Sequence, residues 1–156
     1  MIRKYTPLKF ANDSVEDVLN YLNYNDNLSS SGQPAKNQFP VIQEAGYEVI
    51  INLATYDILD NPLKGEEGIV TRLGMDYVHI PVDFFKPTEE DFQNFLKAMD
   101  HASGKKVWVH CAANARASAF LFGYRCSIQG EDSESAKWDV REIWEPFGSW
   151  KKVISW

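Results

Sequence analysis

Residues 107–118, VWVHCAANARAS, place a cysteine and an arginine where together they could act on an anion. Cys111 follows a strand-like apolar run, and Arg116 stands five positions further on, with only alanines and one asparagine between them. A strand that turns into a helix through such residues directs backbone N–H groups and the positive end of the helix dipole into one hollow. A guanidinium can bind two oxygens of an anion, and the same positive field favours a cysteine thiolate. The segment therefore predicts an active site with a nucleophilic sulfur beside an oxyanion cradle.

The elements that must position these residues alternate between strands and helices. Extended segments are expected at 28–34, 47–53, 77–82 and 107–110, and helices at 14–22, 36–45, 66–73, 88–103, from the loop to about 129, and 133–145. This order predicts an α/β fold: a single domain over residues 1–156, with a central, mainly parallel sheet of four to five strands and helices on both faces. In such sheets ligands bind beyond the carboxyl ends of the strands, which is where Cys111 falls.

Composition excludes several classes of partner. A net charge of −6 offers no electrostatic attraction to nucleic acid or to an anionic membrane. We expect a cytoplasmic protein, because no signal-peptide pattern or membrane-spanning run is present. The two cysteines agree with this expectation: Cys111 and Cys126 would lie about 22 Å apart along one helix and could not form a disulfide. No His, Cys and carboxylate grouping has metal-ligand spacing, so we expect no metal and no cofactor. The oligomeric state is unknown from the sequence.

The segment from His110 to Ser118 resembles the signature loop of the cysteine-dependent protein tyrosine phosphatase superfamily, in particular its compact, dual-specificity-phosphatase-like bacterial branch. Residues 28–34 (LSSSGQP), 50–53 (IINL) and 79–83 (HIPVD) resemble further landmarks of that branch, so the similarity is strongest over residues 28–130. The resemblance implies a metal-independent phosphomonoester hydrolase that acts on a phosphorylated protein or small molecule through a cysteinyl-phosphate.

The resemblance also implies roles for individual residues. Cys111 would be the nucleophile, and Arg116 would bind the phosphoryl oxygens. His110 should face away from the anion and support the loop backbone through hydrogen bonds. Ser118 could in addition donate a hydrogen bond to the sulfur. The predicted phosphate-binding residues are Ala112, Ala113, Asn114, Ala115, Arg116, Ala117 and Ser118.

A general acid is needed to protonate the leaving oxygen and then to activate water. Asp83 is the best candidate, because it follows a predicted strand and lies in a loop with two aromatic neighbours, Phe84 and Phe85, which could exclude water. Asp57 and Asp60, in the other long loop, are the alternatives.

The loop departs from the superfamily pattern in length. Four residues rather than the usual five separate Cys111 from Arg116, and Asn114 stands where glycine is usual. Asparagine tolerates a positive φ, but losing one residue turns a helical side chain by about 100° unless the loop tightens. Two alternatives stay open: a rhodanese-like sulfurtransferase with a persulfide on Cys111, since such enzymes use a six-residue loop, or a pseudophosphatase that binds a phospho-ligand without turnover.

Overall fold

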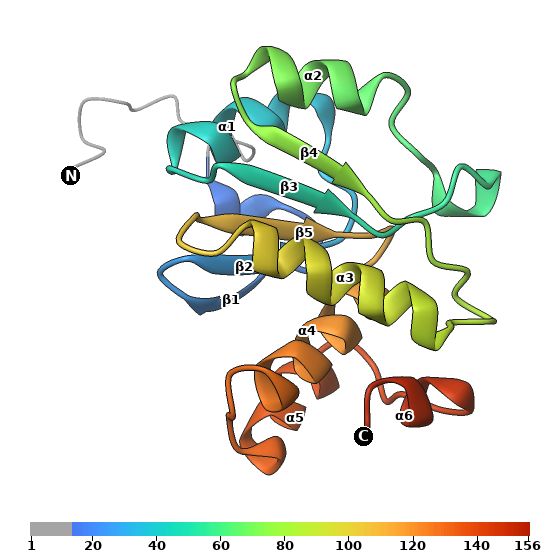
Figure 1. Ribbon diagram of the computed structural model, residues 1–156. Helices are drawn as coiled ribbons and strands as arrows, with labels where there is room; N and C mark the ends of the chain where they lie inside the picture. Colours follow the sequence, from blue (N-terminus) through green and yellow to red (C-terminus); the bar gives the residue numbers. More distant parts are fainter. Residues whose placement is uncertain (1–13) are drawn as a thin grey trace.

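The computed structural model describes residues 14–156 as a five-stranded sheet with helices on both faces (Figure 1). The strands lie in the order β1-β2-β5-β3-β4, with β1 antiparallel to β2 and all other neighbours parallel. Their bounds are β1 (Leu22–Asn25), β2 (Leu28–Ser31), β3 (Val49–Asn52), β4 (Asp76–His79) and β5 (Val107–His110). The predicted α/β class and mainly parallel sheet are confirmed.

The helices form two layers. On one face lie α1 (Phe39–Glu44) and α2 (Glu66–Arg72); on the other lie α3 (Glu89–His101), α4 (Ala115–Ser127), α5 (Ser133–Arg141) and α6 (Ser149–Val153). Short 3₁₀ turns cover η3 (Val15–Asp17), η4 (Lys36–Gln38) and η5 (Ile58–Asp60). Each layer has its own apolar cluster, because successive side chains of β3 and β5 point to opposite faces.

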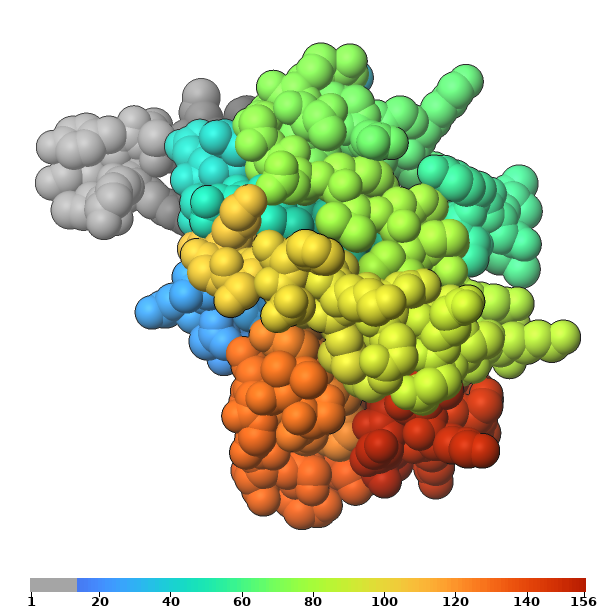
Figure 2. Space-filling view, viewed as in Figure 1, coloured from blue at the N-terminus to red at the C-terminus, as the bar shows by residue number. Residues whose placement is uncertain are grey.

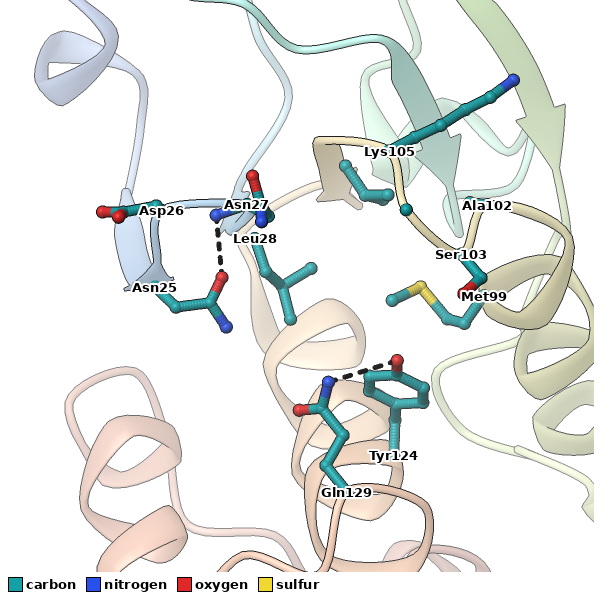
Figure 3. A pocket seen from close by; sticks show the side chains of 12 residues that line it. Asn25, Asp26, Asn27, Leu28, Met99, Ala102, Ser103, Lys105, Tyr124 and Gln129 are labelled. Atoms are coloured by element: carbon teal, nitrogen blue, oxygen red, sulfur yellow. Dashed lines mark hydrogen bonds between the residues drawn. The ribbon is translucent and has the colours of Figure 1, made fainter.

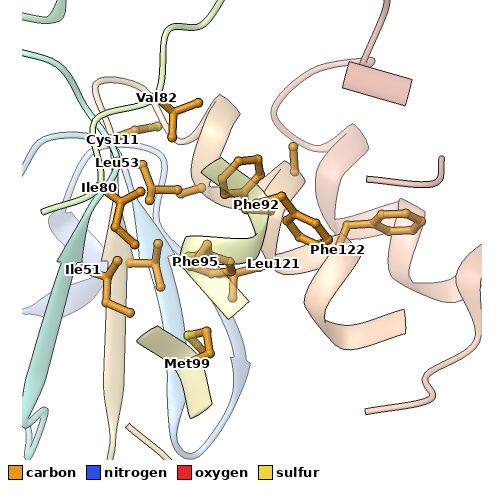
Figure 4. Close-up of a cluster of buried hydrophobic side chains, with 14 of the residues drawn as sticks. Ile51, Leu53, Ile80, Val82, Phe92, Phe95, Met99, Cys111, Leu121 and Phe122 are labelled. Atoms are coloured by element: carbon orange, nitrogen blue, oxygen red, sulfur yellow. The ribbon is translucent and has the colours of Figure 1, made fainter. Parts of the chain in front are cut away.

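The central strand β5 is buried on both faces and carries the signature loop at its carboxyl end. Trp108 packs against Tyr21 and Tyr47 at ring distances of 5.5 and 5.0 Å, and its Nε1–H donates to Ser31 Oγ at 2.8 Å. On the opposite face, Cys111 belongs to the cluster drawn in Figure 4, together with Leu53 and Val82. The nucleophile candidate therefore stands on a rigid support.

Two helix predictions are wrong in part. The helix expected over 14–22 is only the turn η3, capped by Ser14, after which the chain forms the edge strand β1. The helix expected to reach 145 ends at Arg141, because the amides of Ile143 and Trp144 both donate to Val140 O. The short helix α6 was not predicted.

Gly32 allows β2 and the signature loop to approach each other. It forms an isolated bridge to Ala113, and a Cβ added at Gly32 would lie 2.7 Å from Ala112 O and 3.1 Å from Ala113 Cα. We predict that Gly32→Ala lowers the free energy of unfolding by about 1–3 kcal/mol, because backbone atoms must move, as measured by urea denaturation.

Gly68→Ala is the matched control. A Cβ at Gly68, inside α2, would approach only the guanidinium of Arg72, at 3.3 Å, so this change should be neutral or slightly stabilising. Equal losses in the two variants would contradict the close-approach argument.

Candidate active site

The loop after β5 turns its carbonyl groups outward, toward neighbouring segments. The Ala112 carbonyl accepts from the Gln33 amide at 2.9 Å, and the Ala113 carbonyl accepts from the Asn20 side chain at 3.0 Å. Several loop amides make no backbone hydrogen bond within residues 14–156, among them those of Ala112, Ala113, Ala115, Arg116 and Ala117. Uncommitted N–H groups at the start of a helix are suited to binding an oxyanion.

Asn114 makes the sharp turn that the shortened loop needs. Its backbone is left-handed (φ 72°, ψ 7°), as expected from its place in the superfamily pattern, and it caps the N-terminus of α4. Its Nδ2 donates to the Asn20 carbonyl at 2.8 Å, while the Asn20 Nδ2 donates back to Ala113 O. This reciprocal pair ties the loop to the segment before β1.

Arg116 points into the protein and is 4% exposed. Because α4 already begins at Ala115, Arg116 stands on its first turn. The guanidinium donates twice to the Asp60 carboxylate, from Nη1 at 3.0 Å and from Nη2 at 2.7 Å, and once to the Val82 carbonyl from Nη1 at 2.9 Å. Its Nε is buried and has no partner among the described residues, so this N–H is a donor that residues 14–156 leave unused.

The ion pair with Asp60 sets the charge of the site. Burial alone would raise the pKa of Asp60, but hydrogen bonds from Arg116 and Thr55 lower it overall. Burial would lower the pKa of Arg116, but its hydrogen bond to Asp60 and its interaction with Cys111 raise it. Both groups are therefore ionised at neutral pH, and the Cys111 sulfur lies within the electrostatic reach of the guanidinium.

A pocket of about 250 Å³ opens beside Arg116. Figure 2 shows the loop that holds η5 and the loop before α3 projecting at the same end of the molecule, and both contribute to this pocket. The lining residues are Thr55, Asp57, Leu59, Asp60, Asp83, Phe84, Phe85 and Arg116. The structure thus brings Asp83 and Arg116, which the sequence proposed for one site, to one pocket.

The loop that carries Asp83 is anchored by aromatic packing. Asp83 is exposed, and its Oδ1 accepts from the Phe85 amide at 2.9 Å. Phe84 packs against Trp144 and Trp150 at ring distances of 5.2 and 6.0 Å, and Trp150 Nε1 donates to Phe84 O. The unpredicted helix α6 therefore helps to position this loop.

Ser118 does not make the contact that was expected of it. Its Oγ donates to Ala115 O at 3.1 Å, a bond within the first turn of α4, and no hydrogen bond to the sulfur is present within residues 14–156. The side chain is buried (1% exposed). The Ser118 hydroxyl therefore bonds within the first turn of α4 and not to the Cys111 sulfur.

Sequence reasoning missed two acidic partners of the site. Asp60 was considered only as a general acid, whereas here it binds Arg116. Glu66 was not considered at all, yet its Oε2 lies 2.6 Å from His110 Nε2. A glutamate on the first turn of a helix is ordinarily explained by the helix dipole, so nothing in the sequence set Glu66 apart.

A second cavity lies at the other end of β5. Figure 3 shows it between the β1–β2 turn and the end of α3, with Asn27, Met99, Lys105 and Tyr124 among its labelled lining residues. Its volume is about 460 Å³. It faces the amino ends of the parallel strands, away from Cys111, and we assign no chemistry to it.

Comparison with known proteins agrees with this geometry. Residues 2–148 match the family described as PTP-NADK, a DSP-PTPase phosphatase fused to NAD+ kinase. The chain belongs to this phosphatase family. The compact, dual-specificity-like resemblance inferred from the signature loop is thereby confirmed.

Solved structures agree. A putative phosphatase (DUF442) from Shewanella putrefaciens CN-32 is 34% identical, with a TM-score of 0.76 over 90% of this chain and 92% of that chain. A variant of TpbA from P. aeruginosa in complex with pTyr has a TM-score of 0.64 at 16% identity, over 79% of this chain and 72% of that chain, which shows a shared fold. A beta-lactamase hydrolase-like protein of Xylella fastidiosa is 35% identical over 95 residues, 60% of this chain and 22% of that relative.

Two further observations bear on what the chain contacts. Every helix within residues 14–156 is too short or too polar to span a lipid bilayer. The same residues contain no cluster of three or more His, Cys, Asp or Glu side chains suited to holding a metal ion.

We predict that Asp60→Asn lowers the free energy of unfolding by about 1–3 kcal/mol at pH 7, because Arg116 is left buried without its counter-charge. Asp60 has a folded-state pKa below its ordinary value of 3.8, so its ionisation stabilises the fold above that pH. This contribution disappears as the pH falls through the lower folded-state value. The gap between parent and variant in denaturation midpoints should therefore close in acid.

Asp57→Asn is the control for this measurement, because Asp57 is exposed and only caps η5 by accepting from the Leu59 amide. It should change stability by less than about 0.5 kcal/mol. A gap between parent and Asp60→Asn that is independent of pH would contradict the ion-pair argument.

Proposed function

We propose that this chain is a phosphomonoester hydrolase that works through a cysteinyl-phosphate on Cys111. The observation that supports the proposal is the set of N–H donors in the loop that follows Cys111: loop amides without a backbone partner, whose neighbouring carbonyls are bonded elsewhere, and the unpaired Nε of Arg116. Such donors stabilise the charge that builds up on the phosphoryl oxygens. Nucleophile and anion donors all come from the chain, so the proposed reaction needs no metal or cofactor.

In the first proposed step the Cys111 thiolate attacks phosphorus, an S–P bond forms, and the ester P–O bond breaks. The leaving oxygen takes a proton from the Asp83 carboxyl, which becomes a carboxylate. In the second step this carboxylate takes a proton from water, the water oxygen attacks phosphorus, and the S–P bond breaks to return the thiolate and inorganic phosphate. Asp83 is accessible for both transfers because its side chain is exposed at the pocket.

The lining of the pocket supports a substrate with one phosphate and an apolar body. Arg116 is the single cation among the lining residues, against three carboxylates, so a polyphosphorylated ligand would be repelled. Leu59 and Phe85 are 84% and 76% exposed at the rim, where they can contact an apolar group. Of the structural neighbours, TpbA was crystallised with pTyr. An aryl phosphate is therefore the assay substrate of choice.

We predict that Cys111→Ser lowers the rate of aryl-phosphate hydrolysis on the order of 10⁴-fold or more, because the alcohol is a far weaker nucleophile than a thiolate. Binding of inorganic phosphate, measured by calorimetry, should survive, since the amides and Arg116 remain. The chelator EDTA should leave the parent rate unchanged.

Cys126→Ser is the matched control. It removes the other free thiol, which lies on the later part of α4, and should retain full activity. A Cys111→Ser protein that hydrolyses the substrate as fast as its parent would refute the assignment.

We predict that Asp83→Asn slows hydrolysis about 10²-fold or more for substrates with a poor leaving group, and much less for nitrophenyl phosphate, whose leaving group needs little protonation. The measurement is kcat over a series of aryl phosphates. If Asp57→Asn shows this leaving-group dependence and Asp83→Asn does not, the acid is Asp57.

The Asp60–Arg116 pair favours a second candidate, the rhodanese-like sulfurtransferase. Asp60 neutralises much of the guanidinium charge, which suits a persulfide with one negative charge better than a phosphate dianion. Parallel assays of thiosulfate:cyanide sulfur transfer and aryl-phosphate hydrolysis separate the two activities. Phosphate binding without either turnover would identify a pseudophosphatase.

A further inference from the structure

His110 lies between an oxygen of the Glu66 carboxylate, which in its ionised form only accepts hydrogen bonds, and a backbone carbonyl oxygen, which always accepts. Its Nε2 is 2.6 Å from Glu66 Oε2, and its Nδ1 is 3.2 Å from the Cys111 carbonyl oxygen. A neutral imidazole has one N–H and one bare nitrogen, so one of these contacts would set lone pair against lone pair. An imidazolium donates on both sides and satisfies the geometry. The ring is fully buried, with its centroid 6.3 Å from that of the Phe39 ring, so no solvent can substitute for either bond.

Glu66 is the group that would stabilise a positive charge on the His110 ring. Its side chain is 5% exposed at the start of α2. Besides the His110 contact, it accepts from Tyr77 Oη at 3.1 Å and from Gln33 Nε2 at 2.6 Å. Burial alone would raise the pKa of Glu66, but the His110 charge and these three hydrogen bonds lower it overall. A buried ionised carboxylate with this many donors forms a stable ion pair with the ring beside it.

The Glu66 carboxylate also holds the two groups that donate hydrogen bonds to consecutive loop carbonyls. Through His110 it reaches the carbonyl of Cys111, and through the Gln33 side chain it fixes the residue whose backbone amide donates to Ala112 O at 2.9 Å. Both carbonyls are thereby turned outward at the positions where an inward carbonyl would repel an anion. Sequence separation between these residues is large, so only the folded chain assembles the arrangement.

We propose that Glu66 is a positioning residue of the signature loop: it holds His110 as an imidazolium whose Nδ1–H fixes the Cys111 carbonyl away from the anion cradle. The ion pair carries no net charge, so it acts on the cradle by orientation and not by its field. The consequence for turnover rests on the proposed phosphatase function, whereas the charge state of the ring does not.

Nitrogen-15 NMR of the histidine rings tests the charge state directly. At neutral pH the parent protein should show His110 with two protonated nitrogens, and the resonance is assigned by comparison with His79→Gln and His101→Gln variants. Glu66→Gln should convert this signature to that of a neutral ring with one bare nitrogen, and should shift the amide resonances of Ala112 and Ala113. A bare nitrogen on His110 in the parent protein overturns the proposal, even if the variant does not fold.

Kinetics supply the second readout. Glu66→Gln should lower kcat for an aryl phosphate about 10- to 100-fold, the range usual for a residue that orients a reacting group through another. Glu67→Gln, an exposed neighbour, should match the parent in both the spectrum and the rate. A Glu66→Gln protein with an intact imidazolium or with unshifted loop amides refutes the positioning role. Loss of the imidazolium at an unchanged rate refutes it equally.

If the parent protein hydrolyses no phosphate ester, the proposed function is refuted but the role of Glu66 is not. The ring spectrum and the loop amide shifts still decide the role of Glu66, because neither depends on turnover.

Discussion

The site depends on one constraint: every carbonyl of the loop must find a donor on its outer side, so that the amides remain free on the inner side. Successive carbonyls meet the His110 ring, the Gln33 amide and the Asn20 side chain. These donors come from β5, the turn after β2 and the segment before β1. The loop itself consists mainly of alanines and cannot supply them. Its conformation is therefore a property of the whole fold, and not of the signature segment alone.

This constraint explains how the chain accommodates a loop that is one residue short. Asn114 takes the left-handed conformation at the turn. Its side-chain amide donates to the Asn20 carbonyl, the Asn20 side-chain amide donates to Ala113 O, and these two hydrogen bonds hold the turn closed. The helix can then start at Ala115 and carry Arg116 inward. Of the two ways to accommodate the shorter loop, a tighter loop with an early helix start or a rotated arginine, the structure has the first.

Most of the fold could be predicted from the sequence, because the central elements have strong local patterns. The apolar run 47–53 and the Thr88–Asp91 capping box each mark an element whose position is confirmed. The edge strand β1 and the helix α6 were missed, since both owe their structure to distant partners: β1 to its pairing with β2, and α6 to the burial of Trp150 against Phe84. Cys111, the proposed nucleophile, and Arg116 stand out in the sequence because they lie close together in one short segment. Asp60 and Glu66 were not, since carboxylates on loops and helix starts are common and only tertiary packing selects the one that meets a cation.

The contact between Asp60 and Arg116 has a consequence for the end of the proposed catalytic cycle. An arginine that faced the hollow alone would hold inorganic phosphate strongly after hydrolysis. Here one edge of the guanidinium is already neutralised by a carboxylate on a surface turn whose Ile58 and Leu59 side chains are exposed. In the proposed reaction the liberated phosphate would thus meet a weakened attraction, which would favour its dissociation and leave the empty site electrostatically balanced.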